Sequence, residues 1–558
     1  MPSLAHRYCA LTPLLIALLS LPRHACADWT GYAGDPQHSA LSPVASQNLQ
    51  QLLWSTPVDL NPQYSGNDLL IHYGSPVITA ANTVIVPIKT GPSDGFKLNA
   101  FNGLTGALMW TQSTDYTLPQ KTGGGWNWTP SYAPAFAPSD NSGTLFYAGN
   151  GGTIYTRTNV NTNGAVTPAQ LAFYGFANYN SDPALFNSNI AVSTPITTDA
   201  SGNIYFGYTV SSPTGVTLPG VNGGNPLGSG IARISSSGVG TFFQAKDLTV
   251  GASPAGLTQV ATNSAPALSH DGNTIYVAMS SGNAQPGRLV ALSASTLTPT
   301  SSTALLDPLT GTSARLFNDG TASPMVGPDG DVYFGVLDAA SSSFAGSSRG
   351  WMEHYSGNLA VTKPTGAFGW DDTASVVPAS MVPSYHGSST YLVMTKFNNY
   401  IETGGGGQNM LAILDPNDTQ TDNDRNNPTG ATVMKEILRI LGPTSNAPPA
   451  GSVTEWCINT AVVDPATDSI LVNNEDGKLY RWDLSTNSLT QVFTLTAGLG
   501  EAYTPTLIGP DGAVYAVNNA TLFAVGALPE PATLTLLAAA LPLLFTRRRA
   551  RLRTSCHR

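Results

Sequence analysis

The sequence predicts an all-β protein: a single β-propeller of about eight four-stranded blades, with seven as the alternative. Three observations lead to this prediction. A unit of strand, tight turn and strand recurs along the chain, and helical patterns are nearly absent. Only 10% of the residues are charged, whereas glycine, serine, threonine and asparagine are frequent. Such a composition suits short strands joined by polar turns.

Each unit begins with a small residue and a proline and ends in alternating aromatic and β-branched residues, as in ASPMVGPDGDVYFG. Turns such as PDG and HDG supply the positive φ that a hairpin needs. A third strand with a polar ending follows several copies, as in RLVALSASTL, so each unit is interpreted as one four-stranded blade. The positions that open the units are Pro76, Pro134, Pro195, Pro266, Pro324, Pro383, Ala461 and Pro505, spaced by 44 to 78 residues.

The last unit ends near Val525 and shows only two strands. We expect the N-terminal stretch LQQLLWSTPVD, residues 49–59, to complete it, because closing the ring hides sheet edges that otherwise aggregate. One further stretch, GATVMKEILRIL at 430–441, fits either a helix, with Val433, Ile437 and Leu441 on one face, or a strand.

Residues 1–27 are predicted to be a signal peptide. The apolar run from Cys9 to Leu21 is shorter than the about 20 residues that span a bilayer as a helix. Ala25 and Ala27 occupy the −3 and −1 positions of a cleavage site, so the mature chain would begin at Asp28. A buried N-terminal helix is the alternative.

Residues 527–558 have the composition of a second processing signal. Pro529, Glu530 and Pro531 form a stiff motif. An uncharged run of 14 residues, 532–545, follows, and a basic cluster that would stay cytoplasmic ends the chain. The cluster consists of Arg547, Arg548, Arg549, Arg551 and Arg553.

This order of motif, apolar run and arginines resembles the PEP-CTERM sorting signal of Gram-negative bacteria that make exopolysaccharide. The resemblance implies transient arrest at the inner membrane, where the run forms a transmembrane helix. It also implies cutting near the motif by an exosortase, followed by release to the cell surface or beyond. A retained membrane anchor is the alternative.

Composition limits the possible partners. Without the signal peptide and the arginines of the tail, 16 basic residues remain against 34 acidic ones, a net charge near −18. This charge argues against nucleic acid and against anionic membrane surfaces. Cys457 is the single cysteine outside the two signals, so no intramolecular disulfide is expected and stability must come from the core.

The stretch DWTGYAGDPQHSALSPVASQNLQQLLWSTPV, residues 28–58, resembles the N-terminal segment of quinoprotein-type propellers, and AFNGLTGALMW resembles their blade-closing pattern. The resemblance covers most of residues 28–526 and implies the same fold. Enzymes of that family hold pyrroloquinoline quinone with Ca²⁺, often beside two adjacent cysteines. This sequence has no such pair. We therefore expect no cofactor here, and the quinone with Ca²⁺ only if the protein is a dehydrogenase.

One acidic stretch, DPNDTQTDNDRNN, places Asp422, Asp424 and Asn426 at the first, third and fifth positions of a calcium loop. Asn427 stands where glycine is expected, and Val433 replaces the bidentate glutamate. A solvated loop between strands is the alternative.

Residues just ahead of each inner strand should lie at one mouth of the channel, where propellers usually bind ligands. Aromatic rings stack on pyranose faces and carboxylates accept hydroxyl donors, so these positions predict a sugar site. The alternative is that the rings fill the channel and the acids cap turns. We expect Glu455 to face Glu501, with Trp456 and Tyr503 flanking a pocket. The candidate positions are His72, Tyr73, Trp126, Trp128, Tyr132, Asp319, Asp371, Asp372, Glu455, Trp456, Glu501 and Tyr503.

Together these features predict an exported, non-catalytic module of the cell surface or extracellular matrix that binds exopolysaccharide or another surface glycan. Signal peptidase and exosortase are its expected partners during export. A quinone- and calcium-dependent dehydrogenase is the alternative, and a secreted polysaccharide lyase or hydrolase is the third candidate.

Overall fold

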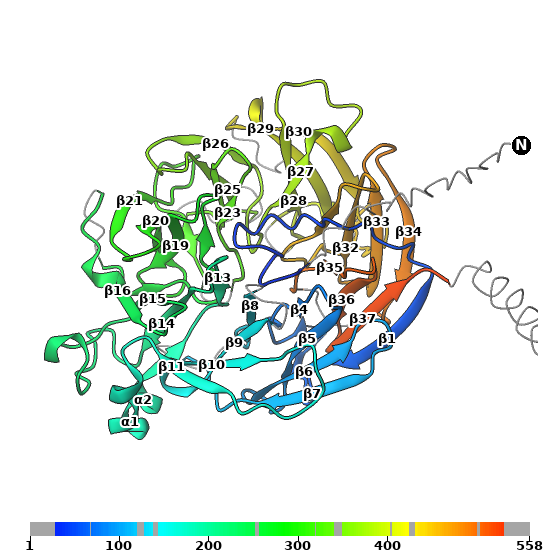
Figure 1. The fold of residues 1–558 in the computed structure, drawn as a ribbon. Helices are drawn as coiled ribbons and strands as arrows, with labels where there is room; N and C mark the ends of the chain where they lie inside the picture. The colour runs from blue at the N-terminus through cyan, green and yellow to red at the C-terminus, as the bar shows by residue number, and fades with distance from the viewer. Residues whose placement is uncertain are drawn as a thin grey trace, which may run out of the picture.

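A computed structural model describes residues 28–528, apart from residue 67 and the segments 120–127, 138–142, 252–255, 318–319, 340–348, 402–403, 423–429 and 499–502. Figure 1 shows the described strands arranged as a ring of blades around a central axis. In this part of the chain, no helix is long and apolar enough to cross a membrane. The predicted signal peptide lies outside the described residues, as does the predicted tail signal from residue 529 onward, including the apolar run 532–545.

The ring contains eight blades of antiparallel strands, as the repeat predicts. Six sheets are single blades, and an eight-stranded sheet contains two more, joined only by the parallel bridge between Thr365 and Val433. The first blade contains β4 (Val77–Ile78), β5 (Thr83–Lys89), β6 (Phe96–Asn102) and β7 (Leu108–Ser113), and the second contains β8 (Ala135–Ala137), β9 (Thr144–Ala148), β10 (Thr153–Thr158) and β11 (Ala169–Ala172). The third contains β12 (Ile190–Val192) with β13 (Thr197–Thr198), β14 (Ile204–Val210), β15 (Gly230–Ile234) and β16 (Gly240–Gln244). The fourth contains β17 (Gln259–Val260) with β18 (Ala267–Leu268), β19 (Thr274–Ser280), β20 (Gln285–Ser293), β21 (Pro299–Ala304) and the added β22 (Arg315–Leu316).

The last four blades follow the same order. The fifth blade contains β23 (Met325–Val326), β24 (Val332–Val336), β25 (Trp351–Tyr355) and β26 (Thr362–Gly366), and the sixth contains β27 (Ser375–Pro378), β28 (Tyr391–Phe397), β29 (Met410–Thr421) and β30 (Thr432–Leu441). The seventh contains β31 (Val462–Asp464), β32 (Ser469–Asn473), β33 (Lys478–Asp483) and β34 (Ser488–Thr494). The eighth contains β35 (Leu507–Ile508), β36 (Val514–Asn518), β37 (Thr521–Gly526) and β1 (Gln51–Pro57). A small hairpin, β2 (Tyr64–Ser65) and β3 (Asp68–Leu69), and two short helices, α1 (Phe176–Ser181) and α2 (Pro183–Asn189), lie between blades.

The eighth blade is closed by the N-terminal strand, which confirms the predicted closure. β1 pairs antiparallel with β37, from Gln51 opposite Gly526 to Pro57 opposite Thr521. The C-terminal part supplies three strands rather than the two expected, because the tight turn at Asn519–Ala520 leads directly into β37. Trp54 on β1 donates its indole N–H to the Gly103 carbonyl in the first blade at 2.7 Å, so the closing strand also links the last blade to the first.

Two sequence assignments need correction. The sixth blade opens at Ala374, ahead of β27, and not at Pro383, which lies in the connection from β27 to β28. Alanine fills the proline slot there, as Ala461 does in the seventh blade. The stretch 430–441 forms the strand β30 and not a helix, because it pairs along its length with the twelve-residue β29.

Buried apolar side chains lie between neighbouring blades, so the core follows the ring. One cluster contains Ile78 and Val86 of the first blade, Leu471 of the seventh and Val514 of the eighth. This arrangement keeps apolar packing away from the axis, where the chain places polar groups and the segment described next.

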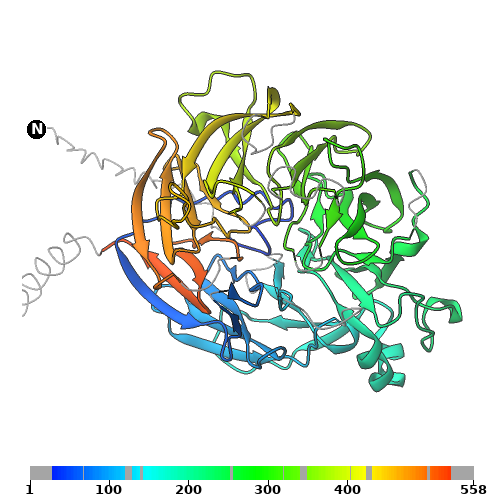
Figure 2. The ribbon, with the colours of Figure 1, turned by 180° about the vertical axis from the view of Figure 1, so that it is seen from behind.

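Residues 29–47 form a segment that we call the axial strap. It crosses the centre of the ring in both views, drawn in dark blue in Figures 1 and 2. Its backbone bonds to seven of the eight blades. Six of the seven partners lie on an inner strand, within two residues of its end, so the strap covers the mouth at which the inner strands end. The bonds are Ile78 N–H to Trp29 O (2.9 Å), Phe136 to Thr30 (2.7 Å), Leu268 to Pro36 (2.8 Å), Val326 to Gln37 (2.9 Å), Val376 to Ser39 (2.9 Å), Val463 to Ala40 (2.9 Å) and Gln47 N–H to Gly512 O (2.8 Å).

Candidate functional site

The segments ahead of the inner strands meet around the axis at the mouth opposite the strap, which we call the upper mouth. Neighbouring segments are hydrogen-bonded: His72 N–H donates to Thr129 O at 2.9 Å, Thr373 N–H to Asn459 O at 3.1 Å, and Asn263 N–H to Ser193 O at 3.0 Å. The positions singled out in the sequence therefore belong to one end of the ring. Which of their side chains face that end depends on each local conformation.

Three predicted aromatic residues come together there from three blades. His72 precedes the first inner strand, Trp128 the second and Tyr503 the eighth. The ring of His72 lies 4.8 Å from that of Tyr503 and 5.7 Å from that of Trp128, and the last two are 5.3 Å apart. His72 is buried, whereas Trp128 and Tyr503 are partly exposed. Their rings are therefore available to a ligand at the upper mouth.

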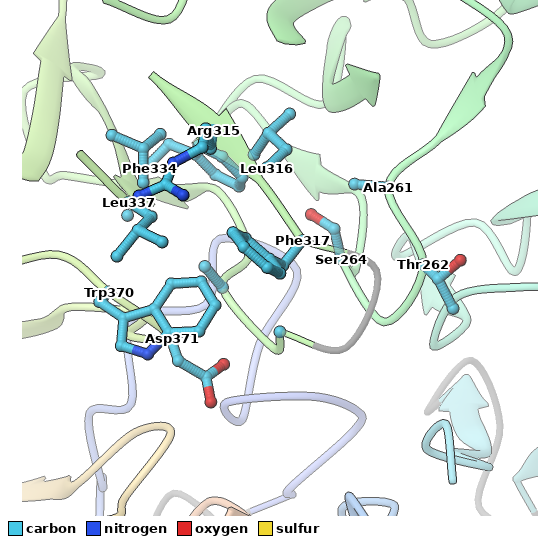
Figure 3. Close-up of a pocket in the computed structure, with 14 residues that line it drawn as sticks. Ala261, Thr262, Ser264, Arg315, Leu316, Phe317, Phe334, Leu337, Trp370 and Asp371 are labelled. Carbon is cyan, nitrogen blue, oxygen red and sulfur yellow. The ribbon is translucent and has the colours of Figure 1, made fainter. Parts of the chain in front are cut away.

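A second group lines a pocket between the fourth, fifth and sixth blades (Figure 3). The rings of Phe317 and Trp370 meet edge to face at 5.0 Å, and the Arg315 guanidinium carbon lies 5.8 Å from the Phe317 ring centre. Asp371 lies beside Trp370 at the other end of the group. The enclosed volume is about 20 Å³, so the pocket is small.

Asp371 is held firmly in this pocket. Its Oδ1 accepts from the Thr321 hydroxyl at 2.6 Å and from the Thr321 backbone N–H. Its φ of 51° lies in the left-handed region, which few non-glycine residues adopt. The sequence pointed to Asp371. It did not point to Arg315 and Phe317, which lie in the connection before the fifth inner strand, or to Trp370, which precedes Asp371 in the connection before the sixth.

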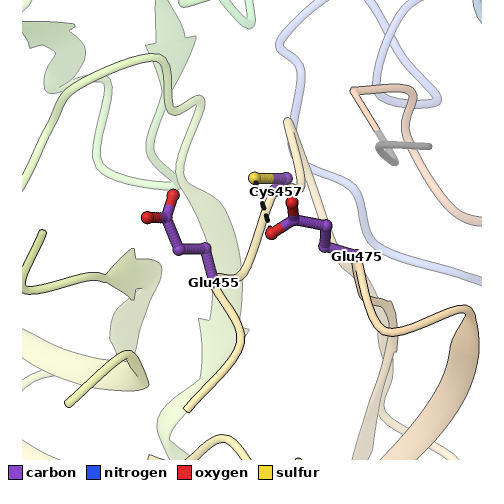
Figure 4. A group of neighbouring side chains, drawn as sticks. All are labelled: Glu455, Cys457 and Glu475. Atoms are coloured by element: carbon purple, nitrogen blue, oxygen red, sulfur yellow. Dashed lines mark hydrogen bonds between the residues drawn. The ribbon is translucent and has the colours of Figure 1, made fainter. Parts of the chain in front are cut away.

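A third group contains Glu455, Cys457 and Glu475 (Figure 4). One ligand atom from each lies within 4.8 Å of the others, and the Cys457 thiol donates to Glu475 Oε2 at 3.7 Å. Glu455 and Cys457 precede the seventh inner strand, and Glu475 lies in the turn from β32 to β33. A thiolate with two carboxylates could hold a divalent transition metal. Beside them, burial raises the pKa of Tyr400, and the nearby Glu455 and Cys457 raise it further.

The expectation that Trp456 flanks a pocket is wrong. Its side chain is 0% exposed and packs in the core between the sixth and seventh blades, 5.7 Å from the Tyr480 ring. Successive side chains of an extended chain point to opposite sides. Since Glu455 and Cys457 belong to one cluster, Trp456 between them turns the other way.

Three other candidate residues lie in the interior. The Tyr73 hydroxyl donates at 3.0 Å to Asp59, which forms a buried ion pair with Lys89. Tyr132 stacks on Phe96 at 4.9 Å between the first two blades. Asp372 is buried, and burial raises its pKa to about 8, with Lys396 opposing the shift. Tyr132 and Asp372 support the fold around the upper mouth, and Tyr73 also lines the small cavity on the ring axis.

Of the predicted calcium loop, Asp422 is described: it is buried, and its backbone N–H donates to Ala431 O at 2.8 Å. Several other predicted positions lie outside the described residues and stay predictions. They are Trp126, Asp319 and Glu501 at the mouth, Asp424 and Asn426 of the calcium loop, Ala25 and Ala27 of the cleavage site, and Pro529, Glu530, Pro531, Arg547, Arg548 and Arg549 of the tail.

No protein-family model matches the chain, and no curated protein matches it in sequence. Among solved structures it is similar to a europium-containing methanol dehydrogenase, with a TM-score of 0.48 and 11% identity over 88% of this chain and 89% of that chain. A quinohemoprotein alcohol dehydrogenase from Comamonas testosteroni gives 0.45 and 11% over 91% and 82%. A computationally designed protein, Ika8, gives 0.42 and 12% over 86% and 100%.

The cavity on the ring axis does not fit the quinone that the resemblance to quinoproteins implies. Its volume is about 10 Å³, whereas ligand pockets commonly measure about 300–1,000 Å³. The Tyr32 hydroxyl enters it from the axial strap and contacts Thr321 O, the Thr373 hydroxyl and Asn459 Oδ1. We therefore assign no quinone chemistry to these residues.

Proposed function

We propose that this protein is an exported, non-catalytic surface propeller that binds a glycan at its upper mouth. One observation carries the proposal: partly exposed aromatic rings and carboxylates gather at one mouth, while the axial strap covers the other. Rings stack on the apolar faces of pyranoses, and carboxylates accept their hydroxyl donors.

The two processing signals supply the rest of the proposal. The signal peptide directs the chain across the inner membrane, and the tail with its PEP-CTERM pattern directs it to the surface of a bacterium that makes exopolysaccharide. That polymer is the first ligand to test.

The test uses purified protein comprising residues 28–531, titrated with exopolysaccharide fragments and screened on a glycan array. We expect Trp128→Ala and Tyr503→Ala each to weaken binding by about 1–3 kcal/mol, as for loss of a stacked ring. Phe176→Ala is the matched control, because Phe176 is an exposed ring on α1 between the second and third blades. Equal loss in all three variants, or no glycan bound at all, would contradict the proposal.

Two assays separate the catalytic alternatives. The protein is mixed with pyrroloquinoline quinone and Ca²⁺ and supplied with an alcohol or a sugar; dye reduction would identify a dehydrogenase. Shortening of the bound glycan during incubation would identify a lyase or hydrolase. The proposed binding module gives neither result.

A further inference from the structure

The pocket in Figure 3 contains the guanidinium of Arg315, whose terminal nitrogens form no hydrogen bond with the residues that the structure describes. Among the described residues, the one hydrogen bond of the Arg315 guanidinium is from Nε to the Asp338 carbonyl, at 2.7 Å. The backbone of Arg315 is fixed by two bonds with Leu337, at 3.1 and 3.2 Å. The side chain is therefore anchored, while its two Nη groups remain for a ligand.

The pocket has two chemically different ends. Figure 3 shows Arg315 at one end and Asp371 at the other, with the rings of Phe317 and Trp370 between them. The bonds from Thr321 reach Oδ1 of Asp371, which leaves Oδ2 to accept from a ligand. A guanidinium binds a carboxylate through two parallel hydrogen bonds, and a carboxylate accepts hydroxyl groups.

We propose that this pocket binds a uronic acid residue of an acidic polysaccharide. A uronate carries its carboxylate at one end of the pyranose and hydroxyl groups at the other, so it matches the two ends of the pocket, and its apolar face lies on the rings. Neutral sugars leave Arg315 unused. A phosphate would pair with Arg315, but it has no apolar face for the rings and is repelled by Asp371.

The small volume of the pocket limits how it can bind a sugar. An enclosed volume of about 20 Å³ cannot surround a pyranose, so the uronate contacts the partly exposed Phe317 and Trp370 from the solvent side. The pocket then takes residues within a polymer as well as residues at its ends. This inference rests on the proposed glycan binding and names the chemical class of the glycan.

The experiment compares two matched probes: an oligogalacturonate and the same oligomer with its carboxyl groups methylated. Wild-type protein should bind the acid form more tightly at about 0.15 M salt, where the repulsion from the net charge near −18 is screened beyond about 8 Å and the close contact with Arg315 is screened less. Arg315→Gln should lower affinity for the acid form by about tenfold or more, because hydrogen bonds to charged groups are the stronger kind, and should leave the ester unchanged.

Two further variants make the result specific. Arg315→Lys keeps the charge without the planar fork and should fall between wild type and Arg315→Gln. Arg233→Gln is the control, because Arg233 on β15 donates to Asn203 and lies outside the pocket. A melting curve confirms that each variant is folded, and Arg315→Lys carries the test if Arg315→Gln is not.

The possible outcomes distinguish failure of the uronate assignment from failure of the proposed glycan binding. Equal binding of acid and ester by wild type, or unchanged affinity in Arg315→Gln, overturns the uronate assignment while glycan binding stands. Binding of no glycan at all overturns both. Preference for the acid form that disappears with Arg315→Gln supports both.

Discussion

At the scale of single residues, Glu353 on β25 is a carboxyl group with almost no access to solvent. Its side chain is 1% exposed, and burial raises its pKa to about 8, with the charge of Asp307 adding to the shift. The Tyr355 hydroxyl donates to Glu353 Oε2 at 3.2 Å and opposes the shift in part. The group is therefore mainly protonated near neutral pH in the folded protein.

This carboxyl group predicts a pH-dependent stability. Between pH 4.5, the ordinary pKa, and about 8, the folded state keeps a proton that the unfolded state has released. Stability should therefore fall as pH rises through this range, by at most about 1.4 kcal/mol per pH unit for one group. Glu353→Gln should reduce the fall and raise the melting temperature at pH 8.

Thermal melts from pH 5 to 8 measure the effect. Asp271→Asn is the control, because Asp271 is exposed and its hydrogen bonds with Ser269 and Asn273 lower its pKa to about 2, outside this range. Identical curves for wild type and Glu353→Gln would show that Glu353 does not titrate in this way.

Single side chains were also the hardest part of the site to predict. The repeat indicates which positions precede the inner strands, and His72, Trp128, Asp371, Glu455 and Tyr503 do lie at the upper mouth. It does not indicate which way each side chain points. Trp456 is in the core for that reason, although both of its neighbours belong to the group at the mouth.

At the scale of elements, the axial strap is held mainly by its backbone. Backbone bonds leave no pattern in the sequence, so the sequence indicated this stretch only through its resemblance to the N-terminal segment of quinoprotein-type propellers and did not predict its path across the axis. β1 was predictable, because residues 49–59 show a strand pattern that belongs to no repeated unit, and the last unit lacks a strand. The blades were predictable for the same reason, since turn residues and alternation recur in every copy.

One side chain of the axial strap allows a direct test of its contribution. The hydroxyl of Tyr32 donates to Thr321 O at 3.3 Å and to Asn459 Oδ1, and it contacts the Thr373 hydroxyl at 2.8 Å. Tyr32→Phe leaves buried polar atoms of three blades without this partner, which should cost about 1–3 kcal/mol of stability.

Denaturant unfolding measures the cost. Tyr64→Phe is the control: Tyr64 is 44% exposed and donates to Asn519 at 2.7 Å near the surface. A similar, small change in both variants would mean that the strap adds little to the closure of the ring.

At the scale of the whole molecule, the first and last segments of the propeller meet on the eighth blade. The side chain of Gln47 accepts from Ala527 N–H at 2.8 Å, and that of Gln50 accepts from Leu528 N–H at 2.9 Å. The folded ring therefore holds the chain up to Leu528. A cut near Pro531 would leave the eighth blade complete.

Processing should therefore release an intact propeller. We expect protein recovered from the cell surface or medium to begin at Asp28 and to lack everything beyond about Pro531. Intact mass measures both ends at once. A mass that still includes residues 547–558 would show that the tail is a retained anchor.

The axial strap also affects the order in which the contacts of the folded protein can form. It precedes every blade in the sequence, yet its partners are spread along the chain, and Gln47 and Ala527 are separated by 480 residues. Contacts between such distant segments form slowly, because a long loop must close before they contribute. The axial strap is therefore expected to gain its full set of partners only after the blades have formed. We therefore expect the ring to close in the last step of folding, when β37 pairs with β1 and the axial strap forms its backbone hydrogen bonds with the blades.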